Sequence, residues 1–137
     1  MLIKLIKTGL FVAGIFFVLM GTLWLGASNT LMTEFAIEPV GLLGLNTVRA
    51  DFGAFFLCLG LFTLGSTRHW RHAETLCYCC ALLMIVAALG RVLGMVFDGL
   101  DPLMIPPFIV EVILAGVYLT LGQHWQKNRQ TRRDTLS

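Results

Sequence analysis

The chain contains four apolar stretches, each long enough to cross a lipid bilayer as a helix. They cover about residues 8–27, 47–67, 73–97 and 105–125. A hydrocarbon core about 30 Å thick needs about 20 helical residues, and backbone groups in lipid must find their partners within the span. The alternation of apolar and polar residues that marks a membrane β-barrel is absent. The sequence therefore predicts an all-α fold, a four-helix transmembrane bundle.

Composition supports the same fold class. Of the 137 residues, 57% are hydrophobic and only 13% are charged, whereas a soluble domain carries about 25% charged residues. The surface of such a chain must be covered mainly by lipid. We expect one four-span membrane domain over residues 1–137, because the chain is too short to divide further.

The basic residues predict the orientation of the bundle. With four spans, eight of the ten lysines and arginines fall on one side, which the positive-inside rule makes cytoplasmic. Both termini are then cytoplasmic, and residues 126–137 form a basic cytoplasmic tail that we expect to fray. The eight residues are Lys4, Lys7, Arg68, Arg71, Lys127, Arg129, Arg132 and Arg133.

Local signals place the remaining elements. Residues 30–37 are expected to form a short helix on the membrane surface after the first span, ended by Glu38-Pro39. Asn46 is a plausible N-cap for the second span. Asp51 would then lie near the positive N-terminus of that helix and interact favourably with it.

Ionisable residues within or at the edge of the outer half of the predicted spans form a candidate polar cluster: Arg49, Arg91, Asp98 and Glu111. Asp51 is set apart because it points nearly opposite to Arg49 on its helix. Glu111 lies roughly 6 Å from the midplane by the helical rise. Charged groups at such depth rarely face lipid, so they are expected to face the bundle interior. Two interpretations remain open: a ligand-binding polar pocket open to the outer side, or a structural network in which Arg91 pairs with Glu111.

Helical spacing sets these charges on stripes that also carry small residues. Small residues allow helices in a membrane to approach closely. The stripes are Arg49, Gly53, Phe56 and Gly60; Ala87, Arg91, Gly94 and Asp98; Glu111, Ala115, Tyr118 and Gly122; and, on the first span, Gly14 and Gly21.

No residue pattern predicts a metal or a cofactor. The histidines His69, His72 and His124 lie at helix ends, and their spacing from Cys77, Cys79 and Cys80 fits no zinc motif. The acidic residues Glu34, Glu38, Asp98 and Asp101 lack the spacing of a calcium loop. We therefore expect no metal and no cofactor, and the basic tail is better explained by topology and lipid contact than by nucleic acid.

Residues 46–111 resemble a bacterial family of small four-helix membrane proteins catalogued as domain of unknown function 4345. The residues that carry the resemblance are Arg49, Phe52, Gly53, Gly60, Gly90, Arg91, Asp98, Gly99 and Glu111. The resemblance implies the four-helix fold and a location in the bacterial inner membrane. It implies no activity.

Three functions stay open from the sequence. The first is binding of a lipid, a quinone or another small amphiphile, with Arg49 and Arg91 meeting its polar head. The second is an accessory subunit of a larger membrane complex. The third is a proton-coupled carrier or membrane enzyme that uses Glu111. The sequence lacks a phosphate loop, a dinucleotide fingerprint and a nucleophile elbow, which disfavours the enzyme. The oligomeric state is left open.

Overall fold

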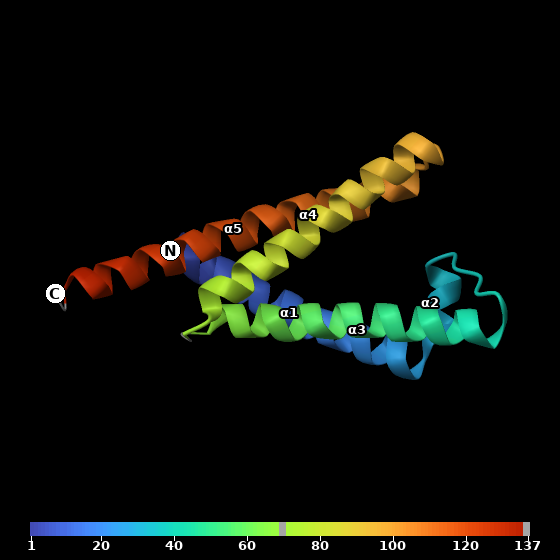
Figure 1. Cartoon of the computed structure of the whole chain (residues 1–137), viewed down its shortest axis with the longest axis horizontal. Coiled ribbons are helices and arrows are strands. Elements are labelled where there is room, and N and C mark those ends of the chain that lie inside the picture. Colours follow the sequence, from blue (N-terminus) through green and yellow to red (C-terminus); the bar gives the residue numbers. More distant parts are fainter. Residues whose placement is uncertain (69–70, 136–137) are drawn as a thin grey trace.

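A computed structural model describes residues 1–68 and 71–135, and the regular structure in these residues is helical. Four long helices form the molecule: α1 (Leu2–Gly26), α3 (Gly41–Thr67), α4 (Ala73–Phe97) and α5 (Ile105–Asp134) (Figure 1). A short helix α2 (Ser28–Glu34) follows α1, and a 3-10 turn η1 (Pro102–Met104) precedes α5. All four long helices have the length and apolar character needed to cross a membrane. The predicted four-helix transmembrane bundle is confirmed.

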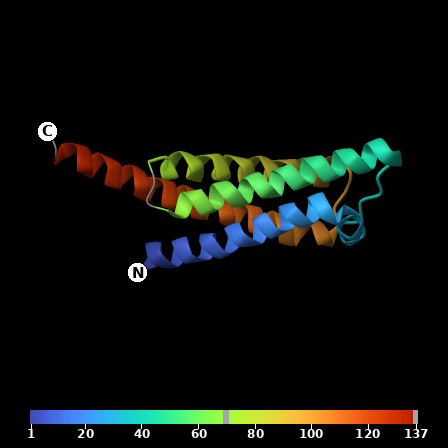
Figure 2. The same cartoon turned by 90° about the horizontal axis from the view of Figure 1, so that it is seen from below.

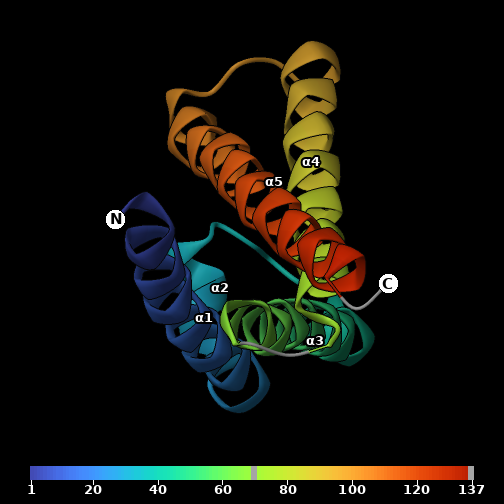
Figure 3. The same ribbon diagram turned by 90° about the vertical axis from the view of Figure 1, so that its left-hand side faces the viewer.

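The long helices pack as two antiparallel hairpins. Helix α1 packs mainly on α3, and α4 mainly on α5, while α3 and α4 make most of the contact between the hairpins. Figures 2 and 3 show the two pairs from below and along the bundle. Both termini and the α3–α4 connection lie at one end, here called the termini end. The opposite end, which holds α2 and the α4–α5 turn, is called the α2 end. The hairpins meet at the termini end and diverge toward the α2 end (Figure 1).

Glycines set the close approach of α1 and α3. A methyl group on Gly60 would lie 2.6 Å from the backbone nitrogen of Val18, and one on Gly21 would collide with the backbone of Leu57. Such contacts are possible only without a side chain, so the two backbones pack directly on each other. The prediction that small-residue stripes bring helices together is confirmed for this pair.

The core that joins the hairpins lies toward the termini end. Tyr118 of α5 is fully buried, and its hydroxyl lies 2.6 Å from Oγ1 of Thr63 on α3. The indole N–H of Trp125 donates to the carbonyl oxygen of Ser66 over 3.0 Å. Lys7 of α1 places its Nζ 3.9 Å from the centre of the Trp125 ring. These contacts tie α1, α3 and α5 together in one place.

The start of α3 differs from the prediction. The helix begins at Gly41, so the expectation that Asn46 caps it is wrong. Gly41 adopts a φ of +66°, a left-handed conformation that glycine reaches without strain, and this turns the chain into the helix after Pro39. No proline lies between Gly41 and Asn46, and Gly44 is accommodated within the helix. Asp51 lies ten residues after Gly41, well beyond the first turn, so its expected interaction with the helix N-terminus is wrong as well.

A short helix after the first span is confirmed, but it covers Ser28–Glu34 rather than residues 30–37. Its end is a Schellman motif: the N–H of Ile37 donates to the carbonyl of Met32, and the N–H of Ala36 to that of Thr33. The motif places Ala36 at a φ of 53°. Helix α2 thus ends before the Glu38-Pro39 pair that was expected to stop it.

The expectation that the chain frays after Trp125 is wrong, since α5 continues to Asp134. Arg129 explains much of this extension. It donates to the carbonyl oxygen of Arg71 over 2.6 Å and forms an ion pair with Glu74 at 3.4 Å. The start of α4 therefore supports the last turns of α5.

Candidate functional site

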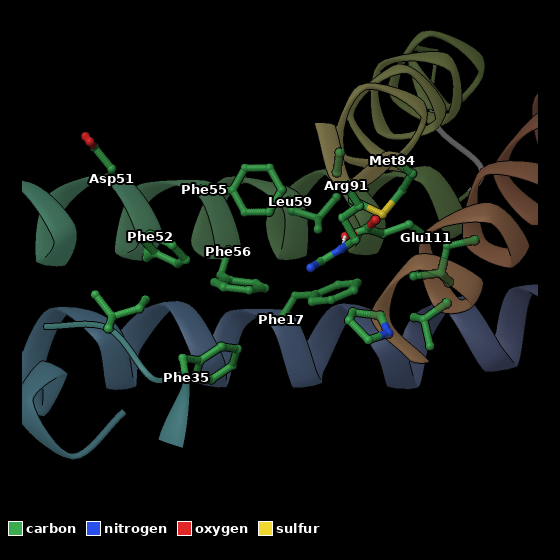
Figure 4. A pocket seen from close by; sticks show the side chains of 15 residues that line it. Phe17, Phe35, Asp51, Phe52, Phe55, Phe56, Leu59, Met84, Arg91 and Glu111 are labelled. Atoms are coloured by element: carbon green, nitrogen blue, oxygen red, sulfur yellow. Dashed lines mark hydrogen bonds and ion pairs between the residues drawn. The ribbon is translucent and has the colours of Figure 1, made fainter. Parts of the chain in front are cut away.

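A cavity of about 770 Å³ lies between the two hairpins, where they begin to diverge. Its walls come from α1, α3, α4, α5 and the segment after α2 (Figure 4). Apolar side chains dominate, and three ionisable residues are set among them. The lining residues are Phe17, Phe35, Ile37, Asp51, Phe52, Phe55, Phe56, Leu59, Met84, Ala87, Arg91, Pro107, Val110, Glu111 and Leu114.

Phenylalanines form one wall of the cavity. Phe52, Phe55 and Phe56 follow one another at the three- and four-residue spacing of a helix face on α3. Phe56 lies nearly parallel to Phe17 of α1, with ring centres 6.2 Å apart and planes 24° apart. Phe35, after α2, completes this wall and packs on the fully buried Trp24. This aromatic wall was not predicted, although the spacing along α3 carried the signal.

An ion pair between α4 and α5 supplies the polar part of the opposite wall. Nε of Arg91 donates to Oε1 of Glu111 over 2.8 Å. The Arg91 side chain is 38% exposed, whereas that of Glu111 is only 12% exposed. The second carboxylate oxygen, Oε2, is shielded and lacks a hydrogen-bond partner in the described part of the chain. Thus the pairing of Arg91 with Glu111, one of the two interpretations left open by the sequence, is present.

The other two predicted residues do not line this cavity. Arg49 donates from Nε to the hydroxyl of the buried Ser28 over 3.0 Å, which ties α3 to the start of α2. Asp98 is the C-terminal cap residue of α4 and is exposed. The structure therefore brings Arg91 and Glu111 together at the cavity and leaves Arg49 and Asp98 outside its lining.

Asp51 lines the cavity and was missed as a site residue. Asp51 lies nearly opposite to Arg49 on α3, and Arg49 donates to Ser28. Asp51 is exposed at the edge of the cavity, and its carboxylate points away from Arg91 and the phenylalanines (Figure 4). Its spacing of four residues from Phe55 and eight from Leu59 places all three on one face of α3. This spacing, taken with the aromatic residues, would have identified it.

The described residues include no group of three histidine, cysteine or acidic side chains that could hold a metal ion. Cys77 and Cys80 are buried, and Cys58 and Cys79 are exposed. His69, one of the three histidines considered as ligands, lies outside the described residues.

Comparison with known families identifies the chain. The model of a family described as "Domain of unknown function (DUF4345)" matches residues 5–121, well over half of the sequence. The chain belongs to this family. Of the residues at the cavity, Asp51, Arg91 and Glu111 all fall within the matched region. No curated protein and no solved structure matches the chain. The family match and the four long apolar helices together make it a multi-pass membrane protein.

Proposed function

We propose that this membrane protein binds a small amphiphile or lipid in the cavity between its hairpins. One observation carries the proposal: a cavity of about 770 Å³ combines an apolar wall with the partly buried ion pair Arg91–Glu111. Ligand sites in proteins are commonly of this size and are lined by apolar groups with a few placed polar ones. An amphiphile has the same division into an apolar body and a polar head.

An occupant would also restore packing that the cavity removes. Side chains that border a void lose dispersion contacts on that side. The aromatic wall, with Phe17, Phe55 and Phe56, loses such contacts along its length. A hydrocarbon tail or ring would replace them, while its head would reach Arg91 on the far wall. The ion pair then serves the ligand and the fold at once.

We further propose that the protein resides in a bacterial inner membrane with the α2 end facing outward. The basic residues Arg68, Arg71 and Arg129 all lie at the termini end, which the positive-inside rule assigns to the cytoplasm. The cavity would then open toward the outer leaflet. Fusion of a cytoplasm-active or periplasm-active reporter to the C-terminus tests this orientation, and a periplasmic C-terminus would refute it.

The binding proposal is tested by mass analysis of protein extracted gently from its native membrane. A stoichiometric small molecule is expected with the wild-type protein and with Val86→Phe, whose side chain is exposed on the outside of α4. The neighbouring substitution Ala87→Phe adds the same ring inside the cavity and should displace the molecule. Arg91→Ala should also lose it. Equal retention in both phenylalanine variants would refute binding at this cavity.

A second candidate, an accessory subunit of a membrane complex, is favoured by two glycines on the outer faces of the α4–α5 hairpin. Gly90 and Gly116 have no side chain within 4 Å of the position a methyl group would take. Outward-facing glycines in spans commonly receive a partner helix. A photo-crosslinker placed at Gly116 should then capture one protein in stoichiometric amount. Labelling of lipid alone would exclude a partner at this face.

A further inference from the structure

The charges that line the cavity restrict the head group it accepts. Among the described lining residues, Arg91 is the one cation, and Asp51 and Glu111 are both acidic. Arg91 is already neutralised by a carboxylate 2.8 Å away. An anionic head would therefore meet a cation that is already paired with Glu111, and Asp51 adds a negative charge at the edge of the cavity. Because no unpaired cation is available to compensate an anion for its lost hydration, the site disfavours an anionic head.

The hydrogen-bonding groups that remain accessible are mainly donors. A guanidinium carries five N–H groups, and the bond to Glu111 uses only the one on Nε. Arg91 reaches from α4 toward the middle of the cavity, so its Nη amino groups are placed to donate to an occupant (Figure 4). The Oε2 atom of Glu111, the matching acceptor, is shielded. The pair thus presents donors to a ligand without presenting a net positive charge.

The aromatic wall adds a preference for a flat ring. Five phenylalanines line the cavity from α1, α3 and the segment after α2, namely Phe17, Phe35, Phe52, Phe55 and Phe56. Offset-stacked or edge-to-face contact between two rings stabilises beyond the apolar area that it buries. Phe55 and Phe56 already meet edge to face, with ring centres 5.3 Å apart.

We infer that the occupant is an uncharged amphiphile of the quinone class: a flat ring with carbonyl oxygens and an apolar tail. A carbonyl would accept from the Nη groups of Arg91, the ring would lie against the aromatic wall, and the tail would follow the apolar lining toward lipid. This inference rests on the proposed function, because it names the ligand class for the same cavity. It concerns binding, and no redox step is implied.

The test compares three probes that share a ten-carbon alkyl tail or one carbon less and differ in the head: decylubiquinone, decanoate and decylamine. Each is titrated against the full-length protein in lipid nanodiscs, and displacement by the others is followed by native mass spectrometry. Wild-type protein should bind decylubiquinone saturably and ahead of both charged probes. Arg91→Gln should weaken this binding about tenfold or more, the effect of losing a hydrogen bond to a charged donor.

Glu111→Gln provides a more specific test, because it is expected to change which probe binds most tightly. It leaves the guanidinium of Arg91 uncompensated, so decanoate binding should strengthen about tenfold and overtake decylubiquinone. Glu74→Gln is the matched control, since Glu74 also pairs with an arginine, Arg129, but at the termini end and outside the cavity. It should change the affinity of no probe.

The outcomes separate the two proposals. If none of the three probes binds the wild-type protein saturably, the proposed function itself fails. If decanoate or decylamine binds the wild type more tightly than decylubiquinone, amphiphile binding stands and the quinone assignment is overturned. If Glu111→Gln does not fold, the order of the probes on the wild type still decides the question.

Discussion

The two ends of this bundle are built differently. At the termini end, Tyr118, Thr63 and Ser66 are fully buried and hydrogen-bonded between the hairpins. At the α2 end, the hairpins separate, and large apolar residues such as Leu42 and Phe97 are exposed. The contrast shows that interactions at the termini end join the two hairpins. Because the hairpins are joined there, they can separate toward the α2 end and leave a cavity between them.

Hydroxyl groups account for much of the difference. Thr63 donates its one hydroxyl proton to the carbonyl of Leu59 one turn earlier, so its oxygen accepts from the hydroxyl of Tyr118. A buried hydroxyl in lipid has no water to turn to, so a partner on another helix is favoured. At the level of the cavity, α3 presents Phe52, Phe55 and Phe56 instead. Their rings fill space but make no directional bond to the second hairpin.

The largest expected effect on stability is at the termini end. Tyr118→Ala removes a fully buried aromatic ring from the junction and should cost about 3 kcal/mol of unfolding free energy. Reversible unfolding in mixed detergent micelles would measure it. Phe55→Ala is the control, since Phe55 is part-exposed at the cavity and should cost less than about 1 kcal/mol. Equal losses in both variants would contradict a junction confined to the termini end.

A second prediction concerns the Arg91–Glu111 ion pair at the cavity. Arg91→Met leaves the mostly covered carboxylate of Glu111 without its partner and should cost about 2 kcal/mol, less than for a fully buried pair. Glu111→Gln should cost less, because the more exposed Arg91 can extend toward the bilayer surface. The double variant should recover part of the loss. A thermodynamic cycle of the four proteins measures the coupling, and additive losses would argue against the pair.

Much of the fold was predictable, because membrane constraints leave few choices. Apolar length, the requirement for internal backbone bonds and the distribution of basic residues together predicted the four helices. The helix ends were less predictable. Asn46 carried a cap signal, yet Gly41 starts α3 five residues earlier. The end of α5 depends on Arg129 reaching Arg71 and Glu74, a contact between residues far apart in sequence.

The candidate site was half predictable. Periodicity alone placed Arg91 and Glu111 on facing stripes, and the structure joins them. It could not show that Arg49 would turn to Ser28, because that bond depends on where α2 begins. The cavity itself depends on the angle between two hairpins. We infer that this angle depends on packing at Tyr118 and Trp125, which lie beyond Leu114, the last residue of α5 that lines the cavity.

A third prediction sharpens the comparison by changing one atom. Tyr118→Phe keeps the buried ring but removes the hydroxyl that meets Thr63 at 2.6 Å. Since Thr63 retains its bond to Leu59, the loss should be about 0.6–1 kcal/mol, as for other hydrogen bonds between spans. Spin labels on the two hairpins at the α2 end should then report a broader distribution of distances between the hairpins. An unchanged distribution would show that ring packing alone fixes the angle.

The smallest effect is expected at Ala36, which follows helix α2 and adopts a φ of 53°. An alanine in this left-handed conformation is strained, whereas glycine is not, so Ala36→Gly should stabilise the protein by about 0.5–1 kcal/mol. The same unfolding assay measures the gain. Ala54→Gly on the exposed face of α3 is the control and should destabilise by a similar amount, because there glycine replaces a good helix former. A gain at Ala36 smaller than the experimental error would mean that the segment around α2 unfolds before the rest of the bundle. Strain relieved in a segment that unfolds earlier does not contribute to the measured free energy of global unfolding.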